Sequence, residues 1–143
     1  MENMKWPEGI KWTKQRKDIF EVLRRATKPM SAYDIYQEIL KDTSVDASNF
    51  AISTVYRSLT IFEEKSLVEK SVLMGSDTAV YELVDGQHKH YAVCLSCHKL
   101  VPLKYCPFEH VAHDSMESED GEFVVTGHKL ELYGYCKDCN VNQ

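Results

Sequence analysis

Four of the five cysteines form two Cys-x-x-Cys pairs, a spacing that is typical of metal-binding knuckles. The first pair is Cys94 and Cys97, and the second pair is Cys136 and Cys139. One knuckle brings two thiolates to an ion, and two knuckles complete the four-coordinate shell that structural Zn²⁺ prefers. A thioredoxin-like redox pair or unconnected core cysteines are the alternatives, but a redox site would not need the second pair. We therefore predict a structural zinc that ties together the two ends of one domain.

The fifth cysteine, Cys106, lies outside these pairs. We interpret it as a small buried hydrophobe, with metal ligation or redox sensing as the alternatives. The N-terminus lacks a basic segment followed by an apolar core, so we expect no secretory signal and a reducing, cytoplasmic compartment. Such a compartment favours metal ligation over disulfide formation.

All six histidines fall within the last 56 residues. His88 and His90 share one side of an extended chain, and His128 belongs to the last predicted strand. A predicted helix opens with Glu109 and His110. If these segments converge, the imidazoles and one carboxylate form a four-coordinate site that suits Zn²⁺, and also Fe²⁺ or Mn²⁺. The alternative is polar surface, which we prefer for His98 and His113.

A third motif, Ser53-Thr-Val-Tyr-Arg57, stands at the start of a predicted helix. Tyr56 can contact thymine methyl groups or a phosphate, and Arg57 can bind guanine or a phosphate oxygen. The hydroxyl groups of Ser53 and Thr54 can face a phosphate at the helix N-terminus. The alternative is an ordinary helix surface, because a Tyr-Arg pair alone is weak evidence.

The net charge of −5 is unevenly distributed along the chain. Residues 11–28 carry seven basic and two acidic side chains, whereas residues 85–143 carry five basic and nine acidic ones. Cations concentrated at one end are typical of a nucleic-acid interface, although a solvated helix face has the same composition. Lys14 and Arg16 are the basic residues that we expect to contact phosphates without reading sequence.

The elements that position these residues follow from hydrophobic periodicity and turn chemistry. We predict helices at 13–26, 32–41 and 54–65, followed by strands at 67–73 and 78–84 that form a hairpin. The expected N-cap residues are Thr13, Ser31 and Ser53. Three short helices followed by a hairpin are typical of a winged helix, a relative of the helix-turn-helix.

The remainder predicts a smaller unit with strands at 91–93 and 99–103, a helix at 107–119 and a strand at 123–133. This β-α-β unit has a thin core, so we expect it to need a metal or a partner chain. The fold class is therefore α+β, with a winged helix over residues 1–84 and a metal-binding dimerisation domain over residues 85–143. No run approaches the roughly 18 apolar residues of a membrane span, so we expect no membrane partner.

With these motifs together, the chain resembles the ferric uptake regulator family over about residues 10–140. The motifs that carry the resemblance are Thr13-Lys-Gln-Arg16, Ser31-Ala-Tyr-Asp-Ile-Tyr36, Ser53-Thr-Val-Tyr-Arg57, Tyr81-Glu-Leu83, His88-Lys-His90 before the first cysteine pair, and Gly127-His-Lys-Leu-Glu-Leu-Tyr-Gly134 before the second.

The resemblance implies a homodimer that binds palindromic operators in double-stranded DNA when its regulatory metal is bound, and so represses metal-uptake genes. It also implies a structural zinc on the four paired cysteines. The regulatory ligands that it implies are His88, His90, Glu109 and His128, with His110 as a substitute for Glu109. This ligand set favours zinc over iron or manganese, as in the zinc uptake branch.

The chain also departs from the family pattern. Many relatives build a second site at the domain hinge from a histidine before the second helix, an acid near the end of the wing and two alternating histidines. Glu82 remains here, but Thr27-Lys-Pro-Met30 has no histidine, and the alternating positions are Lys89 and Tyr91. Iron, manganese, nickel or peroxide sensing remain alternatives, and a metallohydrolase is an alternative of another class. We expect a regulator that is not an enzyme and has no small-molecule substrate.

Overall fold

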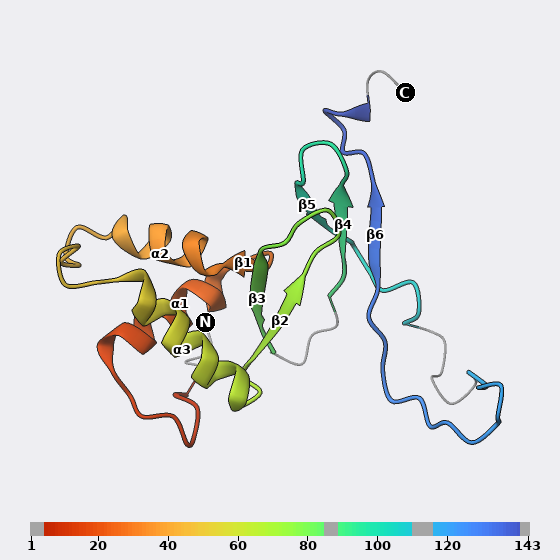
Figure 1. Cartoon of the computed structure of the whole chain (residues 1–143), viewed down its shortest axis with the longest axis horizontal. Coiled ribbons are helices and arrows are strands. Elements are labelled where there is room, and N and C mark those ends of the chain that lie inside the picture. The colour runs from red at the N-terminus through yellow and green to blue at the C-terminus, as the bar shows by residue number, and fades with distance from the viewer. Residues whose placement is uncertain (1–4, 85–88, 110–115, 141–143) are drawn as a thin grey trace. The chain divides into compact units, whose positions relative to one another are not determined.

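The computed structural model describes residues 5–84, 89–109 and 116–140. The chain divides into two compact units, Met1–Gly86 and Gln87–Gln143. The first unit contains three helices and a three-stranded sheet, and the described part of the second contains another three-stranded sheet (Figure 1). None of the helices described is long and apolar enough to cross a membrane.

Helices α1 (Lys14–Arg25) and α2 (Ala32–Leu40) begin at side-chain caps, as the sequence predicts. The hydroxyl of Thr13 accepts from the backbone N–H of Arg16, at 3.1 Å. Ser31 and Asp34 form a reciprocal capping box, in which each side chain accepts from the other residue's backbone N–H. These caps satisfy N–H groups that a helix leaves without internal partners, and they fix where each helix starts.

Helix α3 (Ile52–Glu64) begins two residues before the predicted start, so the expected cap at Ser53 is wrong. Its N-cap is Ala51, which has no side chain able to accept a hydrogen bond. The helix is instead held by burial of Val55, Leu59 and Phe62 on its inner face. Packing of an apolar face therefore overrides the capping preference here.

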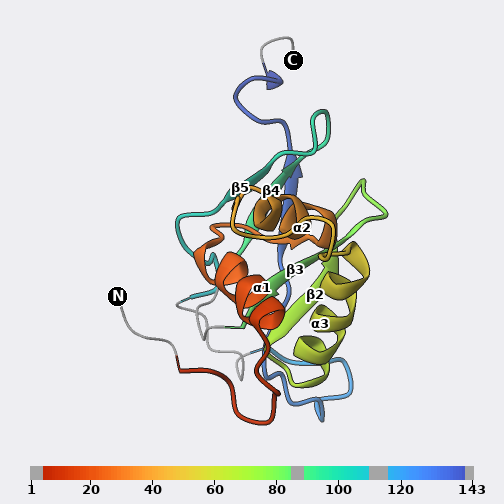
Figure 2. The same ribbon diagram turned by 90° about the vertical axis from the view of Figure 1, so that its left-hand side faces the viewer.

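The sheet of the first unit consists of β1 (Met30–Ser31), β2 (Val68–Val72) and β3 (Ala79–Leu83), in the order β1-β3-β2. All its pairings are antiparallel, and Gly75 at φ +80° allows the turn between β2 and β3. The three helices lie on one side of this sheet, as the two views in Figures 1 and 2 show. This is the winged-helix arrangement expected from the sequence.

The core of the first unit lies between the helices and the hairpin. Phe20 and Phe62 are almost wholly buried, and Trp6 packs edge-on against both rings. The two phenylalanine rings lie 6.5 Å apart in the same edge-on geometry. These contacts hold α1 and α3 together and so fix the exposed face of α3 relative to the rest of the unit.

The second unit is organised by β4 (Tyr91–Cys94), which lies between β5 (Leu100–Pro102) and β6 (Glu131–Gly134). Strand β5 is antiparallel to β4, whereas β6 is parallel to it. The parallel pairing aligns Tyr91 with Glu131 and Cys94 with Gly134. Residues that precede β4 and β6 therefore gather at one end of the sheet, and residues that follow both strands gather at the other end.

Two predicted elements of the second unit are corrected by the structure. The helix expected over 107–119 is wrong at its described ends, because Pro107–Glu109 form a turn and residues 116–118 are irregular; residues 110–115 lie outside the described part. Near its end, Ser118 and Asp120 bond to each other and to the backbone N–H groups of Phe123 and Glu122, which competes with helix formation. The strand expected over 123–133 is reduced to β6, because β4 offers only four residues for pairing.

Candidate metal centres and DNA-binding surface

The paired cysteines meet at the end of the sheet where β4 and β6 both finish. The backbone N–H of Leu95 donates to the carbonyl of Gly134, which holds the ends of strands β4 and β6 side by side. Each knuckle then turns tightly, with His98 N–H donating to the Cys94 carbonyl and Cys139 N–H to the Cys136 carbonyl. The sheet register therefore brings together two sequence motifs that lie far apart along the chain.

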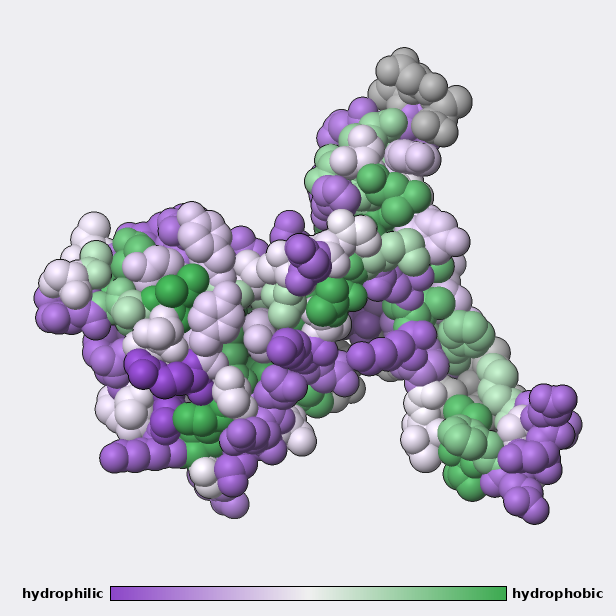
Figure 3. Space-filling model, viewed as in Figure 1, coloured by the Kyte–Doolittle hydropathy of each residue, from purple (hydrophilic) through white to green (hydrophobic). Residues whose placement is uncertain are grey.

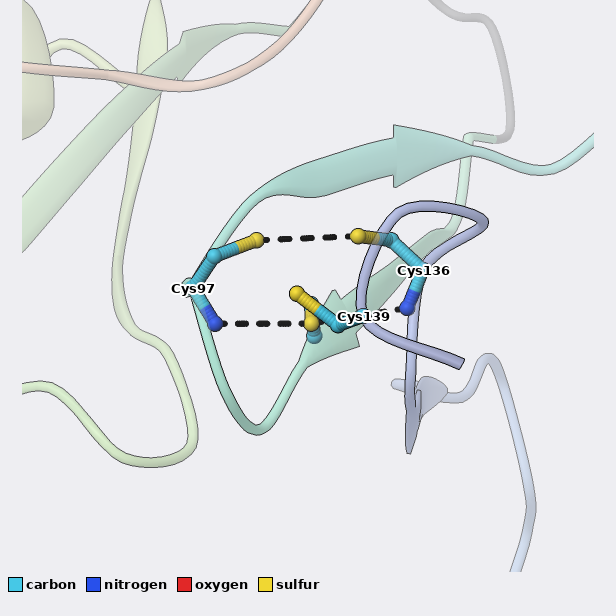
Figure 4. A group of neighbouring side chains, drawn as sticks. Cys97, Cys136 and Cys139 are labelled. Atoms are coloured by element: carbon cyan, nitrogen blue, oxygen red, sulfur yellow. Dashed lines mark hydrogen bonds between the residues drawn. The ribbon is translucent and has the colours of Figure 1, made fainter. Parts of the chain in front are cut away.

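The geometry of this cluster fits one tetrahedral ion. The four Sγ atoms all lie within 4.8 Å of one another, and those of Cys97 and Cys136 are 3.7 Å apart. Figure 4 shows the thiols of Cys97, Cys136 and Cys139 facing a common centre. A tetrahedron with the usual Zn–S bond of about 2.3 Å has edges of about 3.8 Å. The cluster accordingly matches the site predicted from the Cys-x-x-Cys pairs, and it leaves no coordination position open to a substrate.

Electrostatics in the cluster show why it needs a cation. The backbone N–H groups of Cys97 and Cys136 donate to the Cys94 sulfur and lower its pKa to about 6. At Cys139 the Ser96 hydroxyl is the largest influence and lowers the pKa, but hydrogen bonds with the thiols of Cys136 and Cys94 outweigh it and raise the pKa to about 12. Sulfurs this close cannot all ionise unless a positive charge compensates them.

A second group of donor atoms lies at the opposite end of the same two strands. His90 immediately precedes β4, and His128 precedes β6 by three residues. Their Nε2 atoms approach to 3.1 Å, although the residues are 38 positions apart. His90 is buried, with 6% of its surface exposed, and the two rings are nearly stacked, with centroids 5.1 Å apart.

Cys106 is the third member of this second group, and the sequence did not assign it there. Its Sγ lies 3.4 Å from His128 Nε2, and the donor atoms of Cys106, His90 and His128 all lie within 4.8 Å of one another. The Leu103 N–H donates to the His90 carbonyl, so the chain leaving β5 passes beside His90 and delivers Cys106 to it. The place of Cys106 beside His90 could have been predicted from the antiparallel pairing of β5 with β4, because that pairing brings the residues after β5 back to the start of β4.

The structure describes only some of the other residues that we predicted as ligands of the regulatory metal. Glu109 is exposed in the turn after Cys106, and the structure does not group it with His90 and His128. His88 and the alternative ligand His110 lie outside the described residues. Glu82, the remaining acid of the hinge site, is half-buried in β3 opposite Glu69.

The predicted DNA-binding residues of α3 lie on its outer face. Ser53, Tyr56 and Arg57 are exposed, and Thr54 is half-buried. Arg57 Nη2 lies 3.5 Å from Thr54 Oγ1, a weak hydrogen bond that leaves the guanidinium able to turn toward a ligand. Because Val55 is fully buried on the opposite side, the Tyr-Arg pair is held on a rigid surface.

The two basic residues predicted at the start of α1 have local partners. Lys14 Nζ lies 2.9 Å from a carboxylate oxygen of Asp18, and this ion pair raises the pKa of Lys14. Arg16 donates to the backbone carbonyl of Lys11, at 2.7 Å. Exposed interactions of this kind contribute little free energy, so a phosphate can displace them at small cost.

Comparison with known proteins places these features in one family. The sequence profile of the ferric uptake regulator family matches residues 7–133. The chain is 33% identical over 132 residues to the ferric uptake regulation protein of Campylobacter jejuni, covering 92% of this chain and 81% of that protein. It is 31% identical over 132 residues to the peroxide operon regulator of Bacillus subtilis, covering 92% and 86%.

Comparison with solved structures also matches the chain to ferric uptake regulators. The ferric uptake regulator from Francisella tularensis with iron matches with a TM-score of 0.74 at 26% identity, covering 95% of this chain and 98% of that one. Proteins of this family are metal-responsive, DNA-binding transcriptional regulators that act as dimers and are not enzymes, so the metallohydrolase hypothesis is wrong. The winged helix, the cysteine cluster and these matches together show that the chain belongs to the ferric uptake regulator family.

Proposed function

We propose that this chain represses metal-uptake genes by binding a palindromic operator as a homodimer whose regulatory metal is zinc. The observation that carries the proposal is the meeting of His90 and His128, whose Nε2 atoms lie 3.1 Å apart at the ends of two parallel strands. Imidazole suits Zn²⁺ and Fe²⁺, whereas Mn²⁺ prefers carboxylate and water. The described donor atoms therefore favour zinc over manganese.

We assign DNA binding to the winged helix of residues 1–84. Helix α3 would enter the major groove, where Tyr56 and Arg57 read base edges or phosphates. Lys14 and Arg16 would add contacts to the phosphate backbone. In a symmetric dimer the two copies of α3 must stand about 34–36 Å apart, or one DNA turn, to read two half-sites. We place this activity in the cytoplasm.

We assign metal binding and dimerisation to residues 85–143. Green, apolar atoms lie among white and purple ones over this unit in Figure 3. The large apolar side chains that are at least 40% exposed in its described part are Leu95, Val101, Tyr105, Phe123, Val124, Leu132, Tyr133 and Tyr135. A unit with a thin core and this much exposed apolar surface is typical of one half of a dimer interface.

The coupling between metal and DNA rests on where His90 lies in the chain. It follows the end of β3 by seven residues and is among the first described residues of the second unit. A bound ion would supply a fixed link between this segment and His128. His90 and His128 must hold the ion more tightly in the DNA-binding arrangement than in others, and a difference of about 1–3 kcal/mol is typical of such coupling.

The test is a set of operator titrations with the purified dimer. An operator is first selected from random-sequence DNA with Zn²⁺ present, and its affinity is then measured with Zn²⁺, Fe²⁺, Mn²⁺, Ni²⁺ or a chelator. We expect Zn²⁺ to strengthen binding about 5–150-fold over the metal-depleted dimer. Equal affinity with and without every metal refutes metal-dependent repression, and a larger effect of Fe²⁺ or Mn²⁺ refutes zinc as the regulatory ion.

A pair of histidine variants makes this test specific to the site. His90→Ala removes a buried donor beside His128 and should abolish the zinc response of operator binding. The matched control is His98→Asn, because His98 is exposed, lies outside the cluster and has φ +63°, a conformation that asparagine tolerates. A full zinc response in His90→Ala, or its loss in both variants, contradicts the role of His90.

A further inference from the structure

We infer that Cys106 is a ligand of the regulatory metal, so that this site binds its ion through one thiolate and the imidazoles of His90 and His128. The inference rests on the proposed function, because it adds a ligand to the same site. It changes the predicted donor set from nitrogen and oxygen to nitrogen and sulfur.

The distances agree with those around a tetrahedral ion. With a Zn–N bond of about 2.0–2.1 Å and a Zn–S bond of about 2.3 Å, two nitrogens lie about 3.3 Å apart and a nitrogen and a sulfur about 3.6 Å apart. The observed separations are 3.1 Å between His90 Nε2 and His128 Nε2, and 3.4 Å between Cys106 Sγ and His128 Nε2. Small outward movements of the three side chains would therefore seat an ion between them.

The contacts of the Cys106 sulfur also fit a metal ligand. The residue is buried, with 6% of its surface exposed, yet its sulfur lies against imidazole nitrogen. The backbone N–H of Phe108 donates to this sulfur at 3.3 Å. Cys94 in the other cluster receives the same kind of bond from Cys97, at 3.5 Å. The Cys106 sulfur therefore receives the same kind of backbone contact as a sulfur of the four-cysteine cluster.

Phe108 has a second contact that supports the site. Its ring lies 5.1 Å from the His128 ring, at 60° to it. The turn that follows Cys106 therefore both donates to the sulfur and packs against the imidazole. This turn fixes Cys106 and His128 relative to each other before an ion arrives, which lowers the entropic cost of binding.

A thiolate changes which metals the site selects. Soft sulfur ligands favour Zn²⁺ over Mn²⁺, which binds best to carboxylates and water. Co²⁺ serves as a spectroscopic probe, because a sulfur-to-cobalt charge-transfer band appears only when sulfur is bound to the metal. Loss of Cys106 should therefore weaken zinc binding more than manganese binding and remove that band.

The experiment uses the full-length dimer with zinc retained in the four-cysteine cluster, which metal analysis verifies at each step. One equivalent of Co²⁺ is added to the parent and to Cys106→Ser. We expect a sulfur-to-cobalt band in the parent and none in the variant, together with zinc affinity at the regulatory site reduced at least about tenfold, since loss of an outer-shell partner alone costs that much. Equal bands and equal zinc affinities overturn the inference.

X-ray absorption on the parent protein removes any dependence on the variant's folding. Cobalt in the regulatory site should show one sulfur neighbour at about 2.3 Å, and a shell of nitrogen and oxygen alone overturns the inference. Operator titration separates the two proposals. A parent dimer without any metal response refutes the proposed function, whereas a parent that responds to zinc but lacks the sulfur neighbour refutes only the role of Cys106.

Discussion

The four-cysteine cluster should be the main support of the second unit, and Cys97→Ser tests this directly. Among the described residues, the apolar side chains buried in this unit, its cysteines aside, are Tyr91 and Val93. Each contributes about 1.5–3 kcal/mol, or about 3–6 kcal/mol together. A structural zinc contributes about 10–16 kcal/mol in small zinc-dependent domains at neutral pH. The metal therefore outweighs the largest buried side chains of the unit.

We expect Cys97→Ser to lose the structural ion, because Cys97 Sγ lies 3.7 Å from Cys136 Sγ within a closed shell of four sulfurs. Without the ion the knuckles have no common centre, so the second unit should unfold and the dimer should dissociate. The winged helix has a core of its own, with fifteen buried hydrophobic side chains among its described residues, and should remain folded. The one mutation should thus unfold the second unit and leave the first unit folded.

Three measurements test this outcome: the zinc content, the molecular mass in solution, and the thermal unfolding curve recorded by circular dichroism. The parent should retain zinc and behave as a dimer, and the variant should keep the helical signal of the winged helix while its mass falls to that of a monomer. Cys106→Ser is the matched control, since it makes the same chemical change outside the four-cysteine cluster and should keep the structural zinc. A zinc-free Cys97→Ser dimer with the parent's unfolding temperature would refute the reasoning.

Three further changes address the winged helix. Arg57→Ala should weaken operator binding by about 1–3 kcal/mol in a fluorescence anisotropy titration, whereas the exposed Lys104→Ala, which removes the same charge from the second unit, should not. Phe62→Ala should lower the free energy of unfolding by about 3–5 kcal/mol in urea, because it removes a fully buried ring packed against two others; a cost below about 1 kcal/mol contradicts that packing. Ser31→Ala should lower the free energy of unfolding by about 0.5–2 kcal/mol, because it removes the capping box. Ser53 caps no helix, so Ser53→Ala should change the free energy of unfolding by no more than about 0.5 kcal/mol. Equal losses in the two variants would disprove the assignment of the caps.

Much of the fold follows from the sequence because its determinants are local. The apolar spacing and caps of α1 and α2 are contained in short windows, and the turn at Gly75 identifies the hairpin. The four-cysteine cluster is predictable because a Cys-x-x-Cys pair is itself a local motif. The start of α3 was missed because its N-cap residue, Ala51, has no capping side chain that a sequence motif could reveal.

The second unit was harder to predict because it depends on pairing between distant segments. The parallel alignment of β4 with β6 brings His90 to His128, and the antiparallel return of β5 brings Cys106 to both. Neither alignment can be read from local periodicity. The same limitation produced the helix expected over 107–119, where the apolar spacing suggested a face that the described residues do not bury within one chain.

The parallel ladder of β4 and β6 sets the alignment of both candidate metal centres. It joins them over only four residue pairs, a length of about 13 Å. A slip of one residue would turn every side chain of β6 to the opposite face and move His128 about 3.3 Å along the strand. Because the cysteines at one end and the histidines at the other depend on the same four residue pairs, an ion that fixes the cysteine end also fixes the alignment of His90 with His128.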